Sequence, residues 1–171
     1  DVGVLFLAGH GVNDADGDYY FLPSDANTAK LSRTAVSYLF VRKVLSALPG
    51  KTLAFIDTCH SGNIMGARRG GADIDGLVND LTSAENGIVV FASSTGRQYS
   101  LEDKAWGNGA FTKALVEGLG GKADLIKDGA ITINELDAWL ADRVKQLTRN
   151  QQTPTTTKPS TVPDFPVMVS R

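Results

Sequence analysis

The sequence of 171 residues is poor in the residues that build disulfides and metal sites, with one cysteine and two histidines. A single cysteine excludes an internal disulfide and a zinc site made of cysteines. Lysine and arginine number 17 against 19 acidic residues, and this balanced charge gives no reason to expect nucleic acid as a partner. No apolar run reaches the length that crosses a bilayer, so we expect no membrane partner either.

What is present is enough apolar material for one folded unit. The hydrophobic fraction is 42%, so residues 1–171 are expected to form a single domain with a buried core. Three short, continuous apolar runs predict strands buried on both faces of a sheet, at 4–8, 52–57 and 87–92. Three segments with helical spacing predict helices, at 32–48, 110–119 and 132–147, the last opened by the capping box of Thr132 and Glu135.

The order of these elements predicts an α/β domain with a mostly parallel sheet and helices on both faces. A short strand is predicted at 19–22 and an edge strand at 165–169. Residues 151–163 are rich in threonine and proline and are predicted to be extended without regular structure. Residues 63–86 hold several glycines and no sustained periodicity, so we predict a flexible loop there.

Two chemically active side chains, His10 and Cys59, each directly follow a predicted buried strand. Parallel sheets bind ligands at the carboxyl ends of their strands, so the two are expected to lie close together. A cysteine hydrolase needs a thiolate, a histidine that takes up its proton, and backbone N–H groups that stabilise an oxyanion. His60 adjoins Cys59 and would point away from it, which favours His10 as the base. The N–H groups of Gly11 and Cys59 are the predicted oxyanion donors.

Each of these residues also has an ordinary explanation when it is taken singly. A lone cysteine is more often a small buried apolar side chain than a nucleophile. His10 could be a histidine in a turn, and Gly62 could simply begin a helix. The combination, and not any single residue, therefore carries the hypothesis of a cysteine hydrolase.

The segments Leu7–Gly11 (LAGHG) and Phe55–Gly62 (FIDTCHSG) resemble the two catalytic motifs of caspase-like cysteine peptidases. His10 precedes Cys59 by about 50 residues, as in the caspase signature. The animal caspase motif Q-A-C-[RQG]-G is not matched, and the sequence DTCHSG resembles the metacaspase and bacterial caspase-like branch of peptidase family C14. The resemblance continues through 93–96, 98–102, 109–112 and 152–154, and so covers nearly the whole chain.

This resemblance implies a caspase-like fold and a cysteine endopeptidase whose catalytic dyad is Cys59 and His10. In that fold two strands and a helix precede the strand that bears the histidine, and this sequence has no counterpart of them. A sheet without those strands exposes a long edge and apolar surface. We therefore expect a missing N-terminal segment or a partner chain to cover this edge, besides a protein or peptide substrate.

The resemblance also indicates which peptide bond is cut. Asp57 stands where metacaspase-like enzymes have a pocket aspartate, and Glu102 follows Ser100 by two positions, where caspases have an arginine. With Asp57, Ser100 and Glu102 as substrate-binding residues, cleavage after arginine or lysine is expected, because a carboxylate pairs with a guanidinium and repels an acidic side chain. Asp57 could instead be a hydrogen-bond acceptor at the end of the sheet, and Glu102 a solvated charge.

The predicted loop at 63–86 contains a basic pair, Arg68 and Arg69, that would suit the enzyme's own pocket. Self-cleavage there is a hypothesis, and an ordinary solvated loop is the alternative. Related peptidases are commonly processed in this loop. Autoprocessing between the nucleophile and the third strand is thus implied by the resemblance.

No cofactor is expected, although some metacaspases need calcium. The stretch from Asp124 to Glu135 has the spacing of a calcium-binding EF-hand loop, but Ile126 occupies its third position and cannot ligate, so no metal site is assigned. The alternatives are a catalytically silent caspase-like scaffold and a nucleotide-binding module, and the sequence lacks the glycine motifs of the latter. A catalytic thiol suits a reducing cytoplasm, but the compartment stays open.

Overall fold

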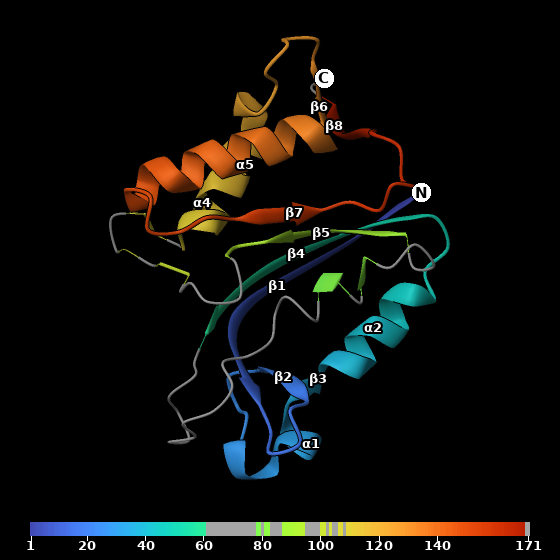
Figure 1. Cartoon of the computed structure of the whole chain (residues 1–171), viewed down its shortest axis with the longest axis vertical. Coiled ribbons are helices and arrows are strands. Elements are labelled where there is room, and N and C mark those ends of the chain that lie inside the picture. Colours follow the sequence, from blue (N-terminus) through green and yellow to red (C-terminus); the bar gives the residue numbers. More distant parts are fainter. Residues whose placement is uncertain are drawn as a thin grey trace.

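The computed structural model describes residues 1–60, 78–79, 81–82, 87–94, 100–101, 103, 106–107 and 109–169, and for Cys59 and His60 it describes the backbone. A central sheet has helices on both sides, with α4 and α5 over one face and α2 over the other (Figure 1). The predicted α/β fold is confirmed. Among the described residues no helix is both long and apolar enough to cross a membrane.

The strands of the central sheet are β1 (Val2–Asn13), β2 (Tyr19–Leu22), β3 (Val36–Ser37), β4 (Lys51–His60), β5 (Ile88–Ala92) and β7 (Thr155–Thr157). The helices are α1 (Leu31–Thr34), α2 (Tyr38–Ser46), α4 (Ala110–Glu117) and α5 (Ile133–Thr148), with a 3₁₀ turn at Thr28–Lys30 and a π-helical turn at Gly118–Lys122. Two further strands, β6 (Ala130–Thr132) and β8 (Pro166–Val169), form a separate antiparallel pair.

The central sheet has the order β3-β2-β1-β4-β5-β7. Its middle strands β1, β4 and β5 are parallel, whereas β2, β3 and β7 each run antiparallel to a neighbour. Parallel strands need a crossover connection, and α2 makes the crossover between β3 and β4. The result is a mixed sheet with a parallel centre and antiparallel margins.

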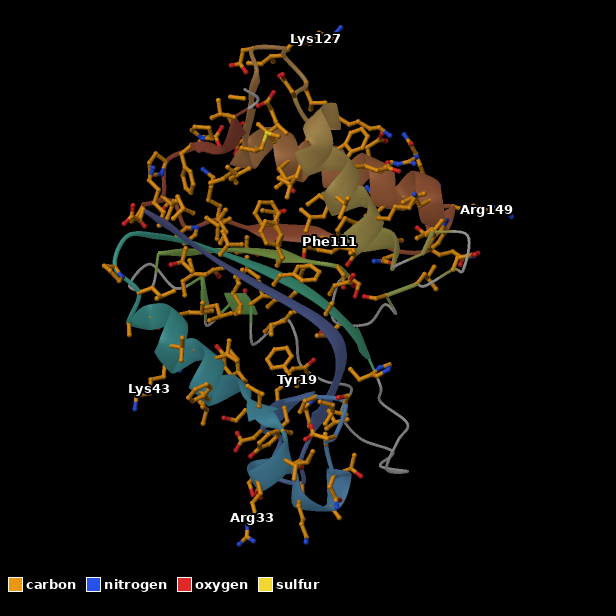
Figure 2. All side chains as sticks on the ribbon, turned by 180° about the vertical axis from the view of Figure 1, so that it is seen from behind. Tyr19, Arg33, Lys43, Phe111, Lys127 and Arg149 are labelled. Carbon is orange, nitrogen blue, oxygen red and sulfur yellow. The ribbon has the colours of Figure 1, made fainter. Side chains whose placement is uncertain are left out.

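Alternating side chains of β4 and β5 build two separate cores. Leu53 and Phe55 of β4 pack with α4 and α5, whereas Ala54 and Ile56 pack with α2. Burial on both faces explains why these strands are continuously apolar. Figure 2 shows one large residue from each core, Phe111 between α4 and the sheet and Tyr19 on the side of α2.

The prediction that β1 is buried on both faces is wrong. Leu5 and Leu7 pack in the core on the side of α2, but Val4 and Phe6 on the opposite face are 63% and 44% exposed. The cause is that α4 and α5 cover β4 and β5 and do not extend over β1. The pairing with β2 begins at His10, so within the described residues the edge of β1 before His10 has no neighbouring strand on that side.

The helix predicted at 32–48 is interrupted. Val36 and Ser37 form the short strand β3, and Val36 pairs with Phe21 of β2. The hydroxyl of Thr34 donates to the carbonyls of Asn27 and Lys30 at the end of α1. Ser37 then caps α2 by accepting from the N–H of Phe40.

The prediction that 151–163 lacks regular structure is also wrong in part. Thr155–Thr157 form the edge strand β7, which pairs with β5. Threonine is β-branched and suits a strand, and the outermost position tolerates the nearby Pro154 and Pro159. Only four residues of the loop predicted at 63–86 are described, and two of them, Val78 and Leu81, are buried in the core on the side of α2.

Glu117, at the end of α4, is the centre of an ion-pair network that joins α4 to α5. Its carboxylate accepts from Nε of Arg143 at 2.8 Å and lies 3.3 Å from Nζ of Lys113 and 3.6 Å from Nζ of Lys122. The hydrogen bond from Arg143 is the main reason that the pKa of Glu117 falls from 4.5 to about 2. The network therefore favours the ionised carboxylate in the folded state.

We predict that Glu117→Gln lowers the free energy of unfolding at pH 7 by about 1.5–3 kcal/mol, the range for hydrogen bonds to charged groups. Because the pKa is lower in the folded state, the ionised Glu117 stabilises fully above pH 5 and less as the pH falls from 4.5 toward 2. Urea unfolding at several pH values measures this. The control Asp25→Asn changes an exposed acid after β2, and a difference between wild type and Glu117→Gln that stays constant down to pH 3 would contradict the prediction.

Candidate active site

The register of β1 against β4 sets His10 opposite Cys59 and Ala8 opposite Asp57. Neighbouring strands lie about 4.8 Å apart, so the backbones of His10 and Cys59 are adjacent in the sheet. His10 itself is exposed. The two segments that carry the candidate nucleophile and base therefore meet in the fold, and their catalytic roles stay predictions.

Both strands are longer than the sequence indicates, so the placement of His10 and Cys59 beyond their strands is wrong. His10 lies within β1, because β1 continues to Asn13 as an antiparallel partner of β2. Cys59 lies within β4, whose last residues keep pairing with β1. The strand β5 ends earlier, with Ala92 opposite Ile56. The last four residues of β4 thus extend beyond the end of β5.

Gly11 is buried between β2 and β4, opposite Phe21 and His60. A Cβ at this position would lie 1.8 Å from the hydroxyl oxygen of Tyr19. That hydroxyl donates to Oγ1 of Thr58 at 3.1 Å, on the residue just before Cys59. Glycine is thus required here for packing, and the oxyanion role of its N–H stays a prediction.

Asp57 is 7% exposed and lies on the face of β4 that α4 covers. Its Oδ2 accepts from Oγ1 of Thr112 at 2.6 Å, and a Cβ on Gly109 would lie 3.1 Å from the same oxygen. The carboxylate therefore sits beside the first turn of α4, where the helix dipole favours negative charge. Asp57 is an oriented, buried acid two residues from Cys59, and it also serves as a hydrogen-bond acceptor at the sheet end.

Ser100 comes close to the end of β5. Its hydroxyl and that of Ser93 form a short hydrogen bond, and both side chains are buried. The N–H of Ser93 donates to the carbonyl of Ile56 at 2.8 Å, which ties this segment to β4 just before Asp57. The structure thus brings Ser100 to the same edge of the sheet as Asp57.

Some predicted site residues lie outside the described residues. They are Glu102, Arg68 and Arg69. The same is true of all of 95–99, which overlaps the stretches 93–96 and 98–102 of the family resemblance. Their predicted roles rest on the sequence.

The stretch with EF-hand spacing has its carboxylates engaged with its own backbone. Asp124 accepts from the N–H groups of Asp128 and Gly129, and Glu135 accepts from those of Leu125 and Ile126. Glu135 also closes the capping box with Thr132, which is the largest cause of its lowered pKa. Among the described side chains no group of three or more histidines, cysteines or acids is placed to hold a metal ion.

Three residues of the site were missed by sequence reasoning: Tyr19, Thr112 and Gln152. Their hydrogen-bond partners are 39, 55 and 59 positions away in the chain, so no local spacing reveals the contacts. Thr112 and Gln152 belong to 109–112 and 152–154, two stretches of the family resemblance, but the resemblance gave neither residue a role. Tyr19 carried no signal beyond its place in a predicted strand.

The caspase domain family, peptidase family C14, matches residues 1–166, and the chain belongs to this family. Among 32 solved chains that match is a crystal structure of a protein from Geobacter sulfurreducens, determined as a structural genomics target. The alignment has a TM-score of 0.60 and 18% identity, and it covers 100% of this chain and 72% of that chain. At this identity the likeness shows the fold alone. No curated protein matches the sequence.

We predict that Gly11→Ala destabilises the protein by about 1–3 kcal/mol, the usual cost of overpacking, because the new methyl group collides with Tyr19. Displacing Tyr19 also breaks its hydrogen bond to Thr58. The matched control is Gly120→Ala, where a Cβ meets nothing within 4 Å and little change is expected. Urea unfolding of both variants measures the difference, and equal stabilities would show that Tyr19 does not need the space above Gly11.

Proposed function

We propose that the chain is a cysteine endopeptidase whose nucleophile is Cys59 and whose general base is His10. The observation that carries the proposal is the β1–β4 register, which sets these two residues opposite each other in a chain of the caspase domain family. Sequence distance alone gives no reason for them to meet. The arrangement supplies the pairing of nucleophile and base that thiol catalysis requires.

In the proposed reaction the imidazole of His10 takes the proton of the Cys59 thiol, and the thiolate attacks the carbonyl carbon of the scissile peptide. The N–H groups of Gly11 and Cys59 donate to the oxyanion. Collapse of this intermediate breaks the C–N bond, and His10 returns the proton to the leaving amine. Water then hydrolyses the thioester, again with His10 as base, and the free thiol is restored.

We further propose that the substrate residue before the scissile bond is arginine or lysine. Asp57 supports this, because it is a buried carboxylate near Cys59 that Thr112 holds in a defined orientation. Ser100 lies at the same edge and contributes the second wall of the pocket. Glu102 adds negative charge in this proposal. An acidic substrate side chain would meet like charge and lose its hydration there.

Fluorogenic peptides with arginine, lysine or aspartate at the scissile position test both proposals. We expect cleavage of the arginine and lysine peptides, and a fall of kcat/KM by a factor of about 10³ or more in Cys59→Ala and His10→Ala. Asp57→Asn is expected to lower kcat/KM for the arginine peptide about tenfold to a hundredfold, because a charged hydrogen bond is lost. Asp128→Asn removes an equal charge from an exposed acid beside Lys127, at the opposite end of the molecule from Tyr19 (Figure 2), and serves as the matched control.

The outcomes separate the parts of the proposal. Preference for aspartate would overturn the assignment of the pocket, and equal rates for wild type and Cys59→Ala would overturn the nucleophile. A wild-type protein that cleaves none of the peptides would favour a caspase-like scaffold that binds without turnover.

We also propose that the enzyme cleaves itself after Arg68 or Arg69, because a basic pair in the segment between β4 and β5 fits a pocket for basic residues. Incubation of the purified protein followed by intact-mass spectrometry is expected to show a cut at this pair. The cut should be absent in Cys59→Ala and in the double variant Arg68→Ala with Arg69→Ala. Arg33→Ala, which changes an exposed arginine of α1, serves as the control. Identical fragments from the double variant and the wild type would refute self-cleavage at this pair.

A further inference from the structure

Gln152 is a glutamine whose side chain is completely buried, with 0% exposure. It follows the end of α5, where Arg149 and Asn150 adopt left-handed conformations with φ of 52° and 63° and turn the chain back toward the sheet. Figure 2 shows Arg149 at the outer end of this helix. The reversal lets Gln152 enter the interior after three exposed residues, 149–151.

Both halves of the Gln152 amide are engaged with backbone groups. Its Nε2 donates to the carbonyl of Ser93 at 2.7 Å, and its Oε1 accepts from the N–H of Leu101 at 2.8 Å. Its own N–H donates to Oγ1 of Thr148 at 3.2 Å, on the last turn of α5. Gln152 therefore connects three separate segments: the end of β5, residues 100–101 and the end of α5.

These segments form part of the proposed substrate pocket. Ser93 is bonded to Ile56 through its N–H, and its hydroxyl meets that of Ser100. The carbonyl of Leu101 accepts from the N–H of Ala110, the first residue of α4. From the same helix Thr112 orients Asp57. The amide of Gln152 thus closes a ring of contacts that sets the separation between Ser100 and Asp57.

An amide is suited to this task for a chemical reason. It offers one donor and one acceptor in a fixed plane, so it can hold a carbonyl and an N–H of two segments at once. A glutamate at this position could accept from Leu101 but could not donate to Ser93. An apolar side chain of the same length would fill the space and leave two buried backbone groups without these partners. The amide of Gln152 therefore fixes the positions of two backbone segments as well as filling space in the core.

We propose that Gln152 is a positioning residue for substrate binding. It holds residues 100–101, and with them Ser100, at a fixed position relative to Asp57. This inference rests on the proposed peptidase function. Gln152 touches neither the substrate nor the reacting atoms, so its effect is on KM rather than on kcat. A merely structural glutamine would lower the stability and the fraction of active molecules and leave KM unchanged in those that remain.

The test compares Gln152→Met and Gln152→Glu with the matched control Gln151→Met, which changes the exposed neighbouring glutamine. Titration with an irreversible arginine-peptide inhibitor, which alkylates Cys59 only after it has bound in the folded pocket, gives the concentration of active sites, so that unfolded protein does not distort the rates. We expect KM for the arginine peptide to rise about tenfold in both Gln152 variants, the effect of losing one buried hydrogen bond, with kcat within about twofold. Unchanged KM in Gln152→Glu, which keeps the acceptor for Leu101 and resembles glutamine in size, would overturn the proposal.

A second measurement separates this inference from the proposed function. Binding of a fluorescein-labelled arginine peptide is measured by anisotropy with Cys59→Ala, alone and combined with Gln152→Glu. Binding that weakens about tenfold in the double variant supports the positioning role even where no wild-type cleavage is found. Equal affinities overturn the positioning role while leaving the peptidase assignment intact, and no binding to either protein overturns the pocket itself.

Discussion

The parallel register between β1 and β4 is the constraint on which the candidate site depends. It sets His10 opposite Cys59, and a slip of one residue would pair Cys59 with a glycine and turn the side chains of one strand to the other face. The cores oppose such a slip, because Leu53 and Phe55 must face α4 and α5 while their neighbours face α2. The energy that fixes the site is therefore mostly the burial of apolar side chains several residues away from it.

Two side-chain hydrogen bonds hold the end of β4 in this register, one on each face of the sheet. On the side of α2, the hydroxyl of Tyr19 reaches Thr58, and on the opposite side Thr112 reaches Asp57. Since these residues of β4 alternate and precede Cys59 directly, the strand can rotate in neither direction without losing one bond. Beyond the end of β5 this part of β4 pairs with β1 alone, and the two hydrogen bonds add to that pairing. The residues directly before Cys59 are thus held by side chains from both sides of the sheet.

Sequence patterns correctly predicted the elements whose stabilising contacts lie within a few residues of one another. The capping box of Thr132 and Glu135 gave the start of α5 correctly, because both partners lie within one turn. Val36 was placed in a helix because its spacing is helical, but its pairing partner on β2 is distant in the chain. The strand Thr155–Thr157 was missed for the same reason, since only the edge of β5 makes it a strand. At the site, the motifs that carry the candidate nucleophile and base could be recognised in the sequence, whereas the supporting contacts of Gln152 could not.

The sheet is covered unequally, and the site lies at the border between its two halves. The half formed by β4 and β5 is buried on both faces, while Val4 and Phe6 of β1 face outward with no helix over them in the described part of the chain. Asp57 belongs to the buried half and His10 to the open one. The two candidate site residues are therefore supported differently. The carboxylate of Asp57 is held by α4 through Thr112, whereas no helix lies over the outward face of β1 in the described part of the chain.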